Sequence, residues 1–337
     1  MKKNLKFFAK LIAIMCSVAI LIGIANLQYV TGYYYTDVYG EVKKFENVPN
    51  HITFANFGTS HGLAAFRYDE NDKQSFNFAL SGEDIYHDFQ TLKQFSDHLE
   101  KGCIVTIPVS YFSFCLSTDE PSQKRYYTYL DKQYIRDFSY ETLINTKYLP
   151  VLRSIEFLFK DIIGDQEINS ENFMDDPNAA SFSTFRGFSD MVVYADDTVS
   201  EEQKIQQLKD HADFRSESWR SGRMVLGKAY LDDNTKILCD MINYCYDNGF
   251  RPVLITIPVY QALTEDFTEE ELEYYYFSRI DKVVDSTGIE YIDYSRDKRL
   301  INQPEYYNNS DHMSETGGNA FLEIYKNDLK DKGFAIK

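Results

Sequence analysis

Two long, mainly apolar runs constrain the fold most strongly: residues 103–112 (CIVTIPVSYF) and residues 251–260 (RPVLITIPVY). A strand that is apolar on both of its faces must be covered on both, and such strands occur mainly in parallel sheets. Parallel strands are joined by long crossover connections, which are usually helices. The two runs therefore predict an α/β protein whose parallel sheet lies between helices.

Shorter segments extend this alternation along the chain. Residues 51–58, 75–80 and 289–295 have the short apolar character of strands. Residues 83–102 predict an amphipathic helix that ends at Gly102, because apolar residues recur there at three- and four-residue steps. Further helices are expected over the following residues: 234–249, 269–288, and a last one that begins near Ser314.

The amino terminus carries a different signal. From Leu11 to Ala25 every residue except Ser17 is apolar or small, and four lysines precede this run. The length suits a membrane-spanning helix, and the lysines predict a cytoplasmic amino terminus. We expect residues 1–30 to be a single-pass anchor in the cell membrane, 31–50 a tether, and 51–337 an extracytoplasmic domain with an insertion at about 116–231. A cleaved signal peptide is the alternative.

Charge and cysteine content exclude several classes of protein. The chain has 52 acidic and 35 basic residues, for a net charge of −17, and a surface of this sign repels nucleic acid. The five cysteines show no zinc-finger spacing, so we expect neither a disulfide framework nor a metal site.

The segment Gly58-Thr59-Ser60-His61-Gly62 matches G-x-S-x-G, the nucleophile-elbow pattern of α/β-hydrolases. In that fold the motif follows several strands, whereas only one predicted strand precedes Ser60. We therefore reject the elbow interpretation and regard Gly62 as incidental. Ser60 remains a candidate nucleophile, because it follows the carboxyl end of a strand, where parallel sheets bind their ligands.

A serine nucleophile needs a base, normally histidine. The chain has six histidines: His51, His61, His87, His98, His211 and His312.

Five of these histidines fit the role poorly. His61 is adjacent to Ser60 and is expected to line the pocket, while His51 begins its strand at the opposite end. His87 and His98 lie in the predicted amphipathic helix and are expected at the surface. His211 falls within the polar insertion.

His312 fits the role of base best. It lies after the last predicted strand and before the final helix, which returns it to the edge of the sheet that carries Ser60.

Four segments together resemble the SGNH/GDSL hydrolase superfamily: G-T-S-H at 58–61, FNFALSGEDIYHDFQTL at 76–92, IPVSYFSF at 107–114 and D-H-M-S-x-x-G at 311–317. Within it the chain looks closest to membrane-anchored extracytoplasmic proteins similar to the teichoic-acid D-alanylation protein and to exopolysaccharide O-acetyltransferases. The resemblance covers residues 51–115 and 232–330. It implies a three-layer, flavodoxin-like parallel sheet with a mainly helical insertion.

The resemblance also implies roles for individual residues. Ser60 would be the nucleophile and His312 the base, and the backbone N–H groups of Ser60 and Gly82 would form the oxyanion hole. The superfamily's usual oxyanion asparagine is replaced by Ser110, whose hydroxyl is a candidate donor.

The acid that orients the base departs from the family pattern as well. It normally precedes the histidine by three residues, where this chain has Asn309, while Asp311 directly precedes His312. Asn309, Asp311 or neither could orient the ring.

The implied function is an O-acyltransferase or esterase that acts on a cell-envelope glycopolymer through an acyl-Ser60 intermediate, without a cofactor. The implied partner is a polytopic membrane O-acyltransferase. A non-catalytic glycan-binding or assembly subunit is the competing hypothesis. It rests on Asn309 and on aromatic residues of the insertion that could stack on sugars: Tyr126, Tyr127, Tyr129, Tyr134, Tyr140 and Trp219.

Overall fold

The structure is a computed structural model that describes residues 2–30, 40–69, 71–117, 121–151 and 199–336. Residues 31–39 of the predicted tether, and residues 118–120 and 152–198 of the predicted insertion, lie outside this description. The chain divides into two compact units. One comprises Met1–Lys43 and Pro121–Gly187, and the other Lys44–Glu120 and Phe188–Lys337.

The second unit is built on a five-stranded parallel sheet, which confirms the predicted α/β class. The strands have the order β2-β1-β3-β4-β5, one of the common doubly wound orders. Their bounds are β1 Ile52–Asn56, β2 Ser75–Asn77, β3 Leu99–Val109, β4 Arg251–Thr256 and β5 Glu290–Asp293.

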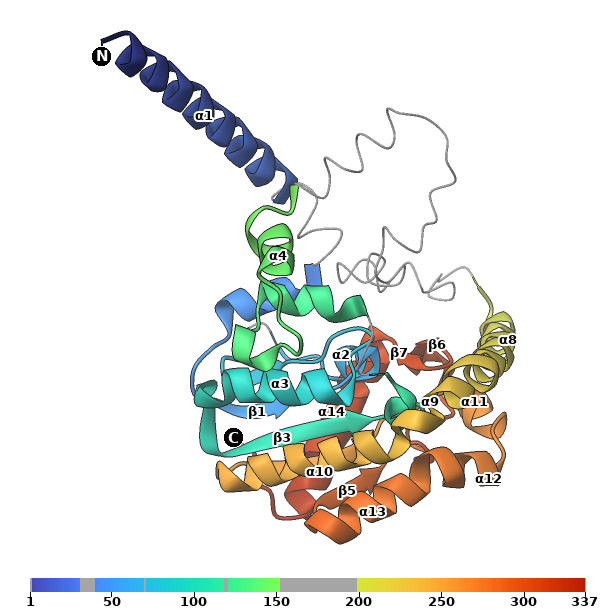
Figure 1. Cartoon of the computed structure of the whole chain (residues 1–337). Coiled ribbons are helices and arrows are strands. Elements are labelled where there is room, and N and C mark those ends of the chain that lie inside the picture. Colours follow the sequence, from blue (N-terminus) through green and yellow to red (C-terminus); the bar gives the residue numbers. More distant parts are fainter. Residues whose placement is uncertain (1, 31–39, 70, 118–120, 152–198, 337) are drawn as a thin grey trace. The chain divides into compact units, whose positions relative to one another are not determined.

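Helices pack on both faces of this sheet (Figure 1). On one face Phe54 and Val253 of the sheet contact Phe321 and Tyr325 of α14 in a continuous buried cluster. The helices on that face are α2 (Ser60–Ala65) and α14 (Glu315–Asp331). Those on the other face are α3 (Ile85–Phe95), α10 (Leu231–Asp247) and α13 (Ser278–Thr287).

The predicted helix over residues 83–102 is wrong at its carboxyl end. Helix α3 ends at Phe95, and β3 begins at Leu99, which pairs with Ile52 of β1. Gly102 lies inside the strand, where its N–H donates to Gly249 O at 2.7 Å. Pairing with a distant strand therefore overrides a local sequence signal that is typical of a helix end.

After β5 the chain forms a small hairpin that the sequence did not predict. Strands β6 (Tyr307–Asn309) and β7 (His312–Met313) are antiparallel, with Asn309 opposite His312. The final helix follows as predicted: Ser314 is the N-cap of α14, and its side chain accepts a hydrogen bond from Gly317 N at 3.1 Å.

The carboxyl-terminal part of the insertion, described from residue 199 on, belongs to the second unit and is helical. Helix α8 (Glu201–Ser218) begins with a capping box formed by Ser200 and Gln203. It buries Leu208, Ala212 and Ser216 on one face. Short helices follow: Trp219–Met224, α9 Val225–Gly227 and Lys228–Tyr230 before α10, then α11 Gln261–Glu265 and α12 Glu269–Leu272 after β4.

The first unit contains the amino-terminal helix α1 (Lys2–Tyr29). Its segment Asn4–Tyr29 has a mean hydropathy of 2.5 and is long and apolar enough to cross a membrane. The described residues of this unit also form short helices, among them Pro121–Thr128, Lys132–Tyr134 and a continuous stretch formed by α4 (Tyr140–Leu143) and a π-helical turn (Ile144–Tyr148).

Candidate active site

Ser60 is the first residue of α2 and lies just beyond the carboxyl end of β1. The turn before it needs a glycine, because Gly58 has a φ of 103°. Its N–H donates to the Asp88 carboxylate at 2.9 Å, and its carbonyl accepts from Leu80 N at 3.1 Å. The nucleophile turn is thus held by α3 and by the loop after β2.

Gly62 is not incidental, which corrects the sequence-based interpretation. A Cβ added to Gly62 would lie 2.7 Å from the carbonyl oxygen of Phe57, closer than real Cβ atoms approach backbone. Both glycines of the G-x-S-x-G match are therefore required, but by the tight turn into α2 rather than by an α/β-hydrolase elbow.

The structure brings Ser60 and His312 together across 252 residues of sequence. The distance from Ser60 Oγ to His312 Nε2 is 2.8 Å, within hydrogen-bond range. Both residues are buried, Ser60 being 9% exposed and His312 1%. His312 reaches this position because β7 follows the turn of the hairpin, at the carboxyl edge of the parallel sheet.

Two side-chain oxygens approach the other ring nitrogen of His312. Asn309 Oδ1 lies 3.0 Å from His312 Nδ1, and Asp311 Oδ1 lies 3.2 Å from it. Asn309 Oδ1 also accepts from the backbone N–H groups of Asp311 (3.2 Å) and His312 (2.9 Å). Asn309 therefore holds the hairpin turn in shape and is the hydrogen-bond partner of His312 Nδ1, while Asp311 places a carboxylate beside the ring.

Asp311 is fully buried and has a cationic partner. Arg215 of α8 donates through Nε to Asp311 Oδ2 at 2.7 Å, which leaves Oδ1 directed at His312. Burial alone would raise the pKa of Asp311, but Arg215 and His312 outweigh it and hold that pKa well below its usual value. The carboxylate is therefore ionised at neutral pH.

The ring of His61 stacks on that of His312. Its ring is parallel to that of His312, with an interplanar angle of 1° and centroids 4.6 Å apart. Its Nδ1 lies 3.0 Å from Thr59 Oγ1, and its Nε2 lies 3.5 Å from Asp311 Oδ2. Burial, reinforced by His312, lowers the pKa of His61 to about 4, so this ring is neutral at pH 7.

The predicted oxyanion donors follow the strands that flank β1. Gly82 lies in an exposed turn after β2 with a φ of 61°, and Ser110 lies directly after β3. Ser110 Oγ is 3.2 Å from Ser113 Oγ. Strand order thus places both residues at the same edge of the sheet as Ser60. Their role as oxyanion donors stays a prediction.

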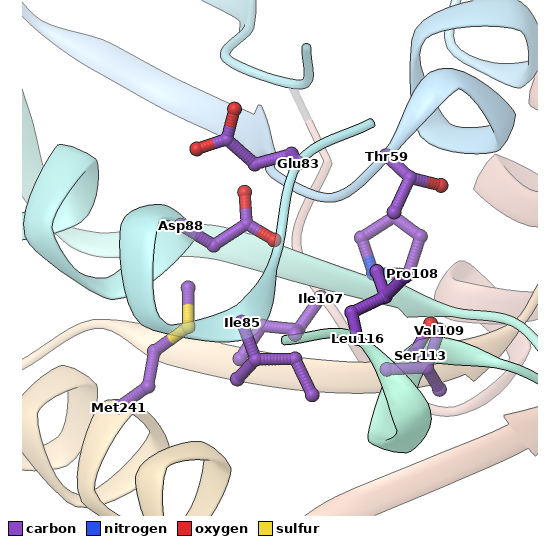
Figure 2. A pocket seen from close by; sticks show the side chains of 10 residues that line it. All are labelled: Thr59, Glu83, Ile85, Asp88, Ile107, Pro108, Val109, Ser113, Leu116 and Met241. Atoms are coloured by element: carbon purple, nitrogen blue, oxygen red, sulfur yellow. The ribbon is translucent and has the colours of Figure 1, made fainter. Parts of the chain in front are cut away.

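A small cavity lies behind the nucleophile turn (Figure 2). Its volume is about 10 Å³, room for about one water molecule and too small for a substrate. Side chains of the turn, α3, β3, its following loop and α10 line it: Thr59, Glu83, Ile85, Asp88, Ile107, Pro108, Val109, Ser113, Leu116 and Met241.

Among the described residues, one group could offer metal ligands: His61, Asp311 and His312, whose candidate atoms lie within 4.8 Å of one another. Two of the atoms in this group already have other partners. His312 Nε2 faces Ser60 Oγ, and Asp311 Oδ2 accepts from the guanidinium of Arg215. A guanidinium on the only carboxylate opposes a second cation, so the donor set suits proton transfer better than metal binding.

The remaining histidines differ in part from expectation. His87 is buried, 3% exposed, with its Nδ1 2.6 Å from Asp84 Oδ2, so the predicted surface position is wrong. His98 is half-buried against Pro49 O, and His51 is exposed. His211 lies beside the site, because its Nδ1 is 2.8 Å from Ser310 Oγ.

Sequence reasoning missed Arg215 altogether. Nothing in the local pattern of the polar insertion distinguishes this arginine from its charged neighbours. Three of the six aromatic residues proposed to stack on sugars are buried: Tyr126, Tyr127 and Trp219. Tyr129 and Tyr134 are half-buried, and Tyr140 is 63% exposed.

No protein-family model matches the chain, and no curated protein matches its sequence. Among solved structures the chain is similar to a provisionally assigned acylhydrolase from Bacteroides fragilis. The two share 11% identity and a TM-score of 0.38, over 92% of this chain and 98% of the other. A likeness at this level establishes neither a shared fold nor a shared activity.

Proposed function

We propose that the chain is an extracytoplasmic serine-dependent O-acyltransferase or esterase that acts on a cell-envelope polysaccharide or teichoic-acid-like polymer. One observation carries the proposal: Ser60 Oγ and His312 Nε2, 252 residues apart, lie 2.8 Å from each other at the carboxyl edge of a parallel sheet. A serine and a histidine in this relation form the nucleophile–base pair of covalent acyl transfer.

The chemistry proceeds in two half-reactions. As Ser60 Oγ forms a bond to the ester carbonyl carbon, its proton moves to His312 Nε2. The carbon–oxygen bond to the leaving alcohol then breaks, and His312 returns the proton to that oxygen. In the second half His312 takes a proton from an acceptor hydroxyl or from water, whose oxygen bonds to the acyl carbon. The bond from that carbon to Ser60 Oγ then breaks, and His312 returns the proton to Ser60.

The surroundings of His312 support this role. Its Nδ1 faces Asp311 Oδ1 at 3.2 Å, so the imidazolium formed in each half-reaction has a carboxylate beside it. We propose that Asp311 supplies the charge and Asn309 the turn that presents it. If Asp311 has this role, the absence of an acid at position 309 no longer favours a non-catalytic subunit.

The test treats the full chain in detergent with a fluorophosphonate probe and, separately, with an aryl acetate. Wild type should be labelled and should release the aryl alcohol, Ser60→Ala should do neither, and His312→Ala should be labelled far more slowly. Equal labelling of wild type and Ser60→Ala would remove Ser60 from the mechanism. A wild-type protein that neither labels nor turns over any acyl ester would point to a binding subunit.

A polytopic membrane O-acyltransferase is the proposed partner, which would deliver acyl groups across the bilayer. The apolar helix α1 and the lysines before it support a domain held at the outer face of the membrane. A polytopic protein should co-purify with the full chain. It should no longer do so when α1 is exchanged for an unrelated membrane-spanning helix.

A further inference from the structure

An exposed apolar stripe occurs on the short helical stretch formed by α4 and the π-helical turn after it. Tyr140, Ile144 and Tyr148 are 63%, 43% and 59% exposed. Side chains four residues apart share one helix face, so the three form a single stripe. Soluble surfaces tolerate single exposed aromatic residues, but a contiguous apolar face calls for a partner.

The stripe is attached to the end of the apolar helix α1. The Asn26 side chain donates to Tyr148 O at 3.0 Å and accepts from Val151 N at 3.2 Å. One carboxamide thus makes two hydrogen bonds to the backbone on either side of Leu149. Both segments belong to the same unit of the chain, and Figure 1 shows α4 beside the carboxyl end of α1.

This attachment places the stripe at a definite depth if α1 spans a bilayer. From Phe7 to Asn26 the helix rises about 30 Å, the thickness of the hydrocarbon core. Asn26 then lies at the outer boundary of that core, and so does the backbone of Tyr148. Tyr140, eight residues earlier, is at most about 12 Å away along its helix.

We propose that Tyr140, Ile144 and Tyr148 lie in the headgroup region of the outer leaflet and dock the first unit on the lipid surface. Tyrosine suits this region because its ring is apolar and its hydroxyl is polar. Ammonium groups that could meet lipid phosphates accompany the stripe: Lys147 is exposed, and Lys132 Nζ donates to Tyr140 OH at 3.3 Å. The proposal does not depend on the chemistry of Ser60.

The test places a reporter in the stripe of the full chain. Tyr148→Trp, Tyr140→Trp and a control, Tyr274→Trp, are reconstituted into vesicles of pure phosphatidylcholine, with and without bromine near the top of the acyl chains. Tyr274 is an exposed tyrosine of the second unit, 49% exposed. The single native tryptophan, Trp219, is buried and provides the same background in every sample.

Tryptophan at positions 148 and 140 should emit at shorter wavelength and lose emission to the brominated lipid, in excess of any loss at position 274. If neither position loses more emission to the brominated lipid than position 274 does, the proposal is wrong. Because the vesicles contain no other protein, such a result would assign the stripe to a protein partner instead. Exchanges of exposed tyrosine for tryptophan are conservative, and circular dichroism of each variant checks that it is folded.

Discussion

Asp311 precedes His312 directly, yet its carboxylate faces Nδ1 of the same ring at 3.2 Å. Neighbouring side chains of a regular strand point to opposite faces, so this contact is possible only because Asp311 lies in a turn and His312 begins β7. Asn309 makes that turn by accepting two backbone N–H groups. In the proposed function, two residues would share the work that one aspartate does in the D-x-x-H pattern.

Because Asn309 and Asp311 have different proposed roles, substitutions of the two residues should have unequal effects. Asp311→Asn removes the charge and keeps the shape, and should lower kcat for aryl acetate by about two to four decades, by comparison with the equivalent change in a serine protease. Asn309→Asp keeps a side-chain oxygen that accepts from both backbone N–H groups, and should retain most of the activity. Steady-state kinetics of both variants at pH 7.5 check this expectation, and a larger loss for Asn309→Asp than for Asp311→Asn would reverse the two roles.

The buried His61 ring predicts a pH dependence of stability. Its pKa is about 4 when folded and near 6.5 when unfolded, so between these values the unfolded state binds more protons and stability falls as pH falls. This histidine should account for a loss of about 2 kcal/mol between pH 7.5 and pH 5.

Urea unfolding of wild type and His61→Gln at both pH values measures this difference. Between pH 7.5 and pH 5 the free energy of unfolding of His61→Gln should fall by about 2 kcal/mol less than that of wild type, whatever the stability of the variant at pH 7.5. An unchanged pH dependence in His61→Gln would contradict the assignment.

At the scale of elements, α8 joins the insertion to the candidate site. Arg215 contacts Asp311, and His211 contacts Ser310. One helix thus holds both residues at the tip of the hairpin formed by β6 and β7. The helix is itself held by buried Leu208 and Ala212, which are 0% exposed. Packing of the insertion is therefore linked to the position of the base.

Leu208→Ala tests this link. The change should cost about 2–5 kcal/mol of stability and also lower kcat/KM by roughly ten- to a hundredfold, since small displacements of catalytic groups have such effects. Leu238→Ala is the matched control, because Leu238 of α10 is equally buried. It should cost similar stability and leave kcat/KM unchanged at a temperature where both variants are folded. Equal kinetic losses in the two variants would argue against a specific role for α8.

At the scale of the molecule, the hydrogen bonds of Asn26 help to predict whether the amino-terminal helix α1 is cleaved or kept. A cleaved signal peptide would leave Tyr148 O and Val151 N without this partner. We therefore expect the protein to keep α1. Intact mass spectrometry of protein extracted from membranes should give the full 39.3 kDa, and a mass short of residues 1–26 would show cleavage.

Much of the fold could be predicted because its signals are local. The apolar runs of β3 and β4 indicated a covered parallel sheet, and Ser314 marked the start of α14. The start of β3 was missed because Leu99 pairs with a strand more than 40 residues earlier, which no local pattern records. Of the candidate site, Ser60 and His312 could be found from their places at strand ends, whereas Arg215 depends on how α8 packs.

The ion pair between Arg215 and Asp311 depends on whether His312 carries a proton. When His312 accepts a proton, two cations share one buried carboxylate, and the hold of Asp311 on Arg215 weakens for as long as the proton stays. Coupling free energies are reciprocal, so a molecule that draws Arg215 away would in turn favour the protonated base. The ion pair therefore links the contacts of α8 to the charge of the His312 ring.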